Sequence, residues 1–170
     1  LPGIFSFVAL LCYLALVAVV AFRRGAKARL DQLFVAYLMA MAFWQVSALI
    51  VSVTTDAPVA LFWYKLMAAG ASVHLIFYFF FVRAFVGTRG QRKLVYIGYV
   101  ACAITVLLSV GGTSQIVESV YLDESTGLYV PHFGTFVYLL ALCGYFFLGQ
   151  GILNLLHRYK QAKSTFERNR

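Results

Sequence analysis

Residues 7–22 read "FVALLCYLALVAVVAF", a stretch that is apolar on every face of a helix. A strand of a transmembrane barrel would alternate apolar and polar residues over about 9–11 positions. This stretch shows no such alternation and continues for longer than a barrel strand does. It therefore predicts a helix that crosses a lipid bilayer.

The rest of the chain repeats this pattern. Of its residues 62% are hydrophobic and 12% are charged, compared with about 45–50% apolar and about 25% charged in soluble domains. Crossing about 30 Å at about 1.5 Å per residue needs apolar runs of at least about 17 residues. Such runs predict spans at residues 1–22, 33–53, 59–82, 94–110 and 133–156, an outer loop at 111–132 and a cytoplasmic tail at 157–170. We expect an all-α membrane protein: a bundle of five transmembrane helices forming a single transmembrane domain over residues 1–170.

The distribution of basic residues predicts the orientation of the bundle. All but one of the 14 Lys and Arg fall in alternate connections, at residues 23–29, 83–93 and 158–170, whereas residues 54–58 and 111–131 contain none. By the positive-inside rule, the N-terminus faces out and the C-terminus faces the cytoplasm. The net charge of +8 is then explained by topology and by attraction to anionic lipid head groups, so we expect the lipid bilayer and no nucleic acid as a partner.

The outer loop has the composition of a hairpin. The turn-prone residues 123–127 stand between two stretches rich in Val, Tyr and Leu. Two roles remain open for such a hairpin. It can tether the fourth and fifth spans with its aromatic residues at the interface, or it can act as a lid that contacts a ligand.

The sequence contains no recognisable catalytic set. It has no nucleophile-elbow motif, phosphate loop or zinc-protease motif, and no carboxylate inside a predicted span. Its cysteines, Cys12, Cys102 and Cys143, all lie in predicted spans at spacings that suit neither a disulfide framework nor a metal site. We expect this chain to have no enzymatic activity of its own and no cofactor. The missing intramembrane acid also makes transport the weakest hypothesis.

The third predicted span carries three basic residues, and two of them have a simple explanation. Lys65 and Arg83 are 18 positions apart, about 27 Å along one face of a helix. They therefore bracket the hydrocarbon layer, and each can extend its charged group to an interface. We interpret both as interfacial anchors.

His74 lies midway between these anchors on the opposite face and cannot reach either interface. Its stripe of the helix is small toward the outside and aromatic toward the inside, which indicates a packing face with a pocket-like change of bulk: Met67, Gly70, Ala71, Phe77, Tyr78 and Phe81. The simplest hypothesis is a neutral imidazole hydrogen-bonded to Gln45 or Ser47 of the second span. The alternatives are a ligand-recognition or pH-sensing group and a haem ligand. His132 and His157 lie at the two ends of the fifth span, too far for a second axial ligand, although haem shared with a partner chain stays open.

The inner end of the fifth span combines small and amide side chains. Small residues allow helices to approach closely, and amides can form hydrogen bonds between helices. We interpret these residues as a site of packing and of signal transmission, with plain bundle packing as the alternative: Gly149, Gln150, Gly151 and Asn154.

Three stretches resemble a known family. They are "LFWYKLMAAGASVHLIFYFFFVRAFVG" at residues 61–87, "LMAMAFWQVSALI" at residues 38–50, and residues 127–170, which end in "STFERNR". Together they resemble the N-terminal seven-transmembrane sensor region of bacterial histidine kinases and some diguanylate cyclases. The resemblance implies that these helices are the first five of seven and that the chain is a multi-pass protein of the bacterial cytoplasmic (inner) membrane. It also implies a two-component output domain outside this chain, with helices 6 and 7 or a second copy as packing partners.

The end of the chain agrees with that interpretation. Ser164 and Glu167 fit a capping box, the pattern that starts a new helix. We therefore expect the sequence to be part of a longer protein.

Two functional hypotheses follow. The first is a membrane-embedded sensory or receptor module that passes a stimulus to a cytoplasmic output domain. The second is a non-catalytic structural or accessory subunit of a larger respiratory or photosynthetic membrane complex, which fits the absence of catalytic residues.

Overall fold

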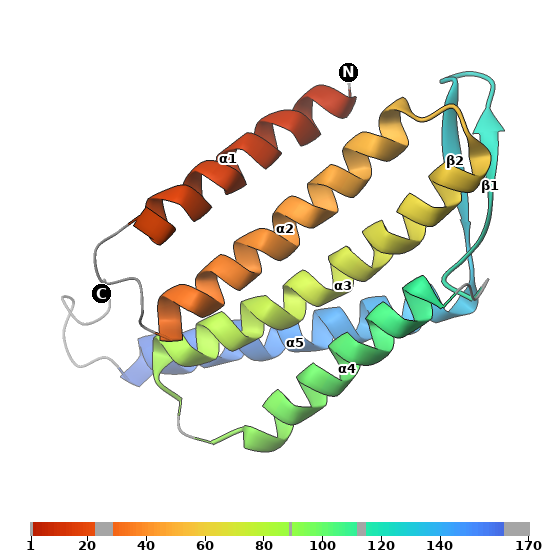
Figure 1. The fold of residues 1–170 in the computed structure, drawn as a ribbon. Helices are drawn as coiled ribbons and strands as arrows, with labels where there is room; N and C mark the ends of the chain where they lie inside the picture. The colour runs from red at the N-terminus through yellow and green to blue at the C-terminus, as the bar shows by residue number, and fades with distance from the viewer. Residues whose placement is uncertain (1, 23–28, 89, 112–114, 162–170) are drawn as a thin grey trace.

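Five long helices and one β-hairpin make up the part of the chain that the computed structural model describes, residues 2–22, 29–88, 90–111 and 115–161. The elements, in chain order, are α1 Pro2–Phe22, α2 Arg29–Val53, α3 Ala57–Val86, α4 Arg92–Val110, β1 Val117–Asp123, β2 Leu128–Phe133 and α5 Thr135–Gln161 (Figure 1). All five helices are long and apolar enough to cross a membrane. The predicted all-α bundle of five membrane helices is therefore confirmed.

The helix ends depart from the predicted spans in understandable ways. α5 begins two residues later than predicted because Phe133 is the last residue of β2, and it continues to Gln161, beyond the apolar run. α3 extends to Val86 and ends where Gly87 adopts a left-handed conformation, with φ of 71°, which glycine adopts without strain. Apolarity predicts where a helix lies in lipid, and capping decides where it ends. The predicted capping box at Ser164 and Glu167 lies outside the described residues.

α3 is the centre of the bundle. In Figure 1 it runs between α2 and α4 with α5 behind it, and α1 packs on the far side of α2. In its most apolar window 39% of the residues are buried, compared with none in α1. The core contains Ile76, Phe79 and Phe80 of α3 together with Phe147 of α5. The rings of Phe79 and Phe147 lie 5.3 Å apart, centroid to centroid.

Glycines allow the neighbouring helices to approach α3 closely. A Cβ at Gly98 of α4 would lie 2.8 Å from Cζ of Phe80, and a Cβ at Gly151 of α5 would lie 2.8 Å from Cε1 of Tyr78. Such small-residue contacts are the main way helices pack in lipid, where apolar burial gives little driving force.

Gly149 does not take part in this contact. A Cβ there would meet no atom within 4 Å in the described part of the chain. Within this bundle Gly151 therefore makes a close helix contact and Gly149 does not, and the packing and transmission role predicted for this group stays a prediction. Two positions along a helix correspond to about 200° around its axis, so the two glycines lie on opposite faces of α5.

The outer loop forms the predicted hairpin. β1 and β2 are antiparallel, with Tyr121 opposite Val130 and Asp123 opposite Leu128. The Asp123 carboxylate stabilises the turn by accepting hydrogen bonds from the hydroxyl and the backbone N–H of Ser125 at 2.7 and 2.9 Å, and from the hydroxyl of Thr126 at 2.9 Å. These bonds, the Ser125 hydroxyl above all, hold the pKa of Asp123 below its usual range.

The hairpin is fixed to the helices rather than free above them. The Tyr64 hydroxyl of α3 donates to the Tyr129 carbonyl at 2.6 Å, and the Tyr129 hydroxyl donates to the Thr55 carbonyl at 3.1 Å. Beneath it, Ile116 and Val117 form a second buried cluster with Leu140 of α5. The hairpin therefore joins the N-terminal parts of α3 and α5.

The two glycines of α5 provide a matched test of the bundle. We expect Gly151→Leu to lower the free energy of unfolding by about 1–3 kcal/mol because the added side chain meets the Tyr78 ring. Gly149→Leu adds the same atoms on an open face and serves as the control. Equilibrium unfolding in mixed detergent micelles measures both. Equal losses for the two variants would contradict the packing described for α5.

Candidate functional site

Arg83 lies in the last turn of α3, and Lys65 lies eight residues after its start, so their role as interfacial anchors stays a prediction. Arg83 also contacts the connection that follows the helix: its Nη2 donates to the Gly90 carbonyl at 2.7 Å. Its Nε is buried and has no hydrogen-bond partner among the described residues. The sequence predicts where Arg83 lies, but not that its guanidinium is partly enclosed by protein.

His74 faces α2 from the middle of α3. Its Nδ1 lies 3.1 Å from the Gly70 carbonyl oxygen one turn earlier. Because a carbonyl can only accept, Nδ1 is the donor in this bond. The imidazole stacks on the indole of Trp44, with ring centroids 5.4 Å apart and planes within 9°. The ring of Tyr37 lies 6.5 Å away, centroid to centroid.

The predicted hydrogen bonds from His74 to Gln45 or Ser47 are not formed. Ser47 is fully buried, and its hydroxyl donates to the Phe43 carbonyl of its own helix at 2.9 Å. The side chain of Gln45 makes no hydrogen bond to a described residue. The partner of His74 on α2 is Trp44 instead of either of these two side chains. The sequence predicts a hydrogen-bonding partner on α2, whereas the observed partner is the flat face of an aromatic ring.

Gly70 explains how Trp44 reaches His74. A Cβ at Gly70 would lie 3.4 Å from Cβ of Trp44 and 3.5 Å from its Cα, so α2 comes close to α3 at this point. The same glycine supplies the carbonyl that accepts from His74. A glycine four positions before a mid-membrane histidine is the signal in the sequence that could have indicated this contact.

A small cavity of about 240 Å³ adjoins this contact on the hairpin side. It lies between α2, α3 and α5 and includes Phe133 from the end of β2. Its lining is mostly apolar, and the described lining residues with a polar side-chain group are Trp44, Ser72 and Tyr145. The others are Met67, Ala68, Ala71, Leu75, Phe133, Val137 and Ala141. The change from small to aromatic residues along α3 predicts a pocket, and the cavity lies at the small end of that stripe, beside Met67 and Ala71. Its volume is near the lower end of the range for small-molecule sites, about 300–1,000 Å³.

At the opposite end of the bundle, two amide side chains form a reciprocal pair. Gln91 Nε2 donates to Asn154 Oδ1, and Asn154 Nδ2 donates to Gln91 Oε1, both at 3.2 Å. Asn154 was predicted to bond between helices, but its partner was missed because Gln91 lies in a short basic connection. Gln91 adopts a left-handed conformation, with φ of 54°, directly before α4. Gln150, the other predicted amide, makes no hydrogen bond to a described residue.

The remaining histidines bond locally. His132 Nδ1 lies 3.0 Å from a carboxylate oxygen of Glu118 across the hairpin. His157 Nε2 lies 2.8 Å from Nε2 of Gln161, one turn further along α5. Within the described ranges, no three His, Cys, Asp or Glu side chains gather as a set that could hold a metal ion.

The membrane helices, the outer hairpin and the order of these features agree with a comparison at the level of families. Residues 4–170 match the family model described as the N-terminal 7TM region of histidine kinase. The chain belongs to this family. The match covers nearly the whole sequence and confirms the resemblance drawn from residues 38–50, 61–87 and 127–170. No curated protein and no solved structure matches the chain. As a member of the histidine kinase 7TM family, the chain is a multi-pass membrane protein.

The amide pair allows a direct test of coupling between α5 and the connection before α4. We expect a double-mutant cycle with Gln91→Ala and Asn154→Ala to give a coupling energy of about 0.6 kcal/mol, with about 1.7 kcal/mol as the upper end for such bonds in membranes. Unfolding in mixed micelles supplies the four free energies. Gln150→Ala is the control, for which we expect no coupling to Gln91. Additive effects of Gln91→Ala and Asn154→Ala would show that the bonds between the two amides make no net contribution to the free energy of unfolding.

Proposed function

We propose that this chain is the sensory membrane module of a bacterial histidine kinase, embedded in the inner membrane, and that it passes a stimulus received in its outer half to a cytoplasmic output domain. Family membership supports the assignment to such a kinase. The observation that carries the sensory role is that α5 reaches from the 240 Å³ cavity, which also includes Phe133 of the hairpin and Trp44 of the Trp44–His74 stack, to the amide pair at the other end.

The cavity is placed where an occupant would act on several elements together. Trp44 belongs to α2, Ser72 to α3 and Tyr145 to α5, and Phe133 ends the hairpin. A ligand shifts a conformational equilibrium only if it binds one arrangement more tightly than another. A small apolar molecule that separates or draws together these elements meets that condition.

α5 supplies the route to the inner end. Its cavity-lining residue Ala141 and its amide-pairing residue Asn154 are thirteen positions apart, about 20 Å along a continuous helix. The contacts of α5 with α3 at Gly144 and Gly151 lie along this length. A displacement at the cavity is therefore transferred along packed backbone rather than through loosely held side chains.

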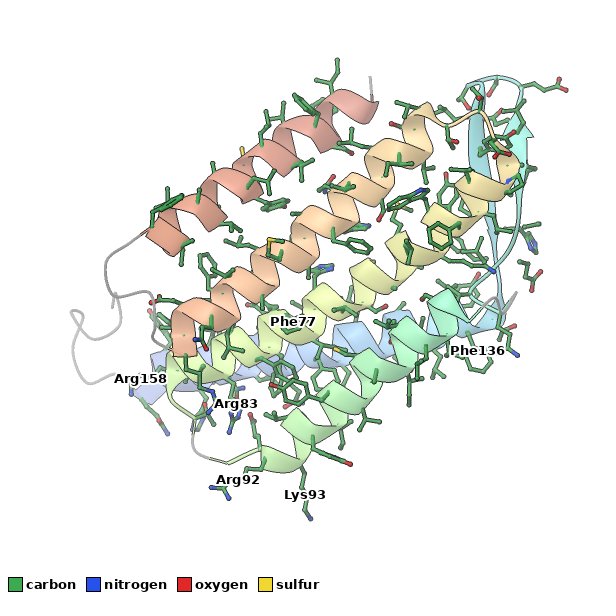
Figure 2. The ribbon with its side chains drawn as sticks, viewed as in Figure 1. Phe77, Arg83, Arg92, Lys93, Phe136 and Arg158 are labelled. Carbon is green, nitrogen blue, oxygen red and sulfur yellow. The ribbon has the colours of Figure 1, made fainter. Side chains whose placement is uncertain are left out.

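The orientation that we propose, with the N-terminus out, rests on charge. Arg83, Arg92, Lys93 and Arg158 gather at one end of the bundle, and Phe136 and the hairpin lie at the other (Figure 2). The hairpin carries Glu118, Asp123 and Glu124. The positive-inside rule places the basic end in the cytoplasm.

Labelling of intact cells tests this orientation. In a background with the three native cysteines changed to alanine, we expect Glu124→Cys in the hairpin turn to react with a membrane-impermeant maleimide. Lys160→Cys, exposed on the last turn of α5, should react only after the cells are opened. The reverse pattern would overturn the proposed orientation.

The stacked histidine tests the sensory role. We expect His74→Phe to leave membrane insertion intact, because phenylalanine keeps an aromatic ring beside Trp44, but to remove the bond to the Gly70 carbonyl. The expected result is a change of roughly threefold or more in the signalling output of the full-length protein, within the range by which single residues alter coupling. Autophosphorylation in native-lipid nanodiscs measures this output.

His157→Phe is the control for this substitution because His157 is exposed and bonds only to Gln161 in the described part of the chain. Unchanged output in His74→Phe would remove His74 from the proposed route. Purification with a stoichiometric redox complex, instead of kinase output, would favour the accessory-subunit hypothesis.

A further inference from the structure

A large cavity of the described bundle lies at its basic end, away from the proposed sensory site. Its volume is about 750 Å³, which is within the range of small-molecule sites. It opens between the start of α2, the end of α3 and the start of α4. The described residues around it are Arg29, Leu30, Leu33, Phe80, Arg83, Ala84, Gly87, Thr88, Gly90, Arg92, Val95, Tyr96 and Tyr99.

Three arginines from three helices converge on this cavity. Arg29 begins α2, Arg83 lies in the last turn of α3, and Arg92 begins α4. Among the described lining residues, none is Asp or Glu, so no carboxylate from this lining neutralises them. Three positive charges around one space favour an anionic occupant.

Arg83 is held in a way that suits an oxyanion. The bond from its Nη2 to the Gly90 carbonyl fixes the guanidinium plane. Its buried Nε finds no acceptor among the described residues. The planar fork of arginine pairs well with the oxygens of a phosphate.

The opposite wall of the cavity is apolar and aromatic. Leu33, Phe80 and Val95 lie deeper along their helices than the arginines do, and the rings of Phe80 and Tyr99 are 4.7 Å apart, centroid to centroid. Tyr96 is 71% exposed, as is usual for tyrosines at a membrane interface. A free phosphate would leave this wall without a partner, whereas a phospholipid would place its phosphate among the arginines and its acyl chains along the apolar residues.

We propose that this cavity binds one anionic phospholipid through its phosphate, with Arg83 as the main contact and Arg29 and Arg92 as flanking contacts. The bound head group joins α2, α3 and α4, of which α2 and α4 each pack extensively against α3. The site lies at the cavity mouth and is distinct from the Trp44–His74 contact.

Native mass spectrometry of the full-length protein, released from nanodiscs that contain phosphatidylglycerol and phosphatidylethanolamine in equal parts, tests the proposal. We expect retained phosphatidylglycerol in the unaltered protein. We expect each arginine to change the retention of phosphatidylglycerol about fivefold. Arg83→Gln should therefore reduce retention about fivefold, and the double variant Arg29→Gln, Arg92→Gln about 25-fold. The double variant leaves α3 unaltered, so it remains informative if Arg83→Gln fails to fold.

Lys93→Gln is the matched control. Lys93 neighbours Arg92 and is exposed, but it does not line the cavity. We expect its loss to change retention less than about twofold, because a charge outside the site is screened. Equal effects of Lys93→Gln and the arginine variants would show general attraction to anionic lipid and would overturn the site.

A second arm separates lipid from a soluble anion. In nanodiscs of phosphatidylethanolamine alone, inorganic phosphate should not bind and should not displace phosphatidylglycerol in the mixed discs. Retention of inorganic phosphate that depends on Arg83 would overturn the assignment to a lipid. Absence of retained phosphatidylglycerol in the full-length protein would show that another segment occupies the cavity, and would overturn the proposal as well.

Discussion

The close contact of glycine-bearing helix faces with the aromatic face of α3 is the interaction on which the bundle depends. In lipid, transfer of apolar side chains from one helix surface to another gains little, so helices associate where their shapes allow near contact of backbone and ring. Gly98 lies against Phe80, and Gly151 lies against Tyr78. α1 packs mainly against α2 and has no buried residue in its most apolar window, so it is the most peripheral of the described helices.

Much of this architecture could be predicted because the bilayer imposes a length and a polarity. The number and position of the five helices follow from apolar runs, and the hairpin follows from turn residues between β-prone stretches. Family membership was also visible in residues 61–87 and in the end of the chain, although most of that pattern is hydrophobic spacing. These features depend on local sequence, which a single chain displays directly.

The contacts of the candidate site depend on the rotation of each helix, which apolarity does not specify. Residues that are apolar all round give no preferred face, so Gly149 and Gly151 looked equivalent although they point in opposite directions. For the same reason Trp44 was overlooked beside Gln45 and Ser47. Gln91 was missed because it lies in a connection whose path could not be drawn from sequence. In each case the sequence shows a residue suited to a contact between helices, but it does not show which residue lies opposite.

The junction between the hairpin and α5 has a mechanical consequence. A single residue, Gly134, separates the end of β2 from the start of α5, and its N–H donates to the Ile116 carbonyl at 3.1 Å. The hairpin and α5 are therefore expected to move together as one rigid unit, in which the helix is the longer part. α5 has 27 residues, about 40 Å of helix. At that length, a tilt of about 5° at the hairpin end moves the opposite end sideways by about 3.5 Å, so a slight movement of the hairpin becomes a larger lateral displacement at the far end of the helix.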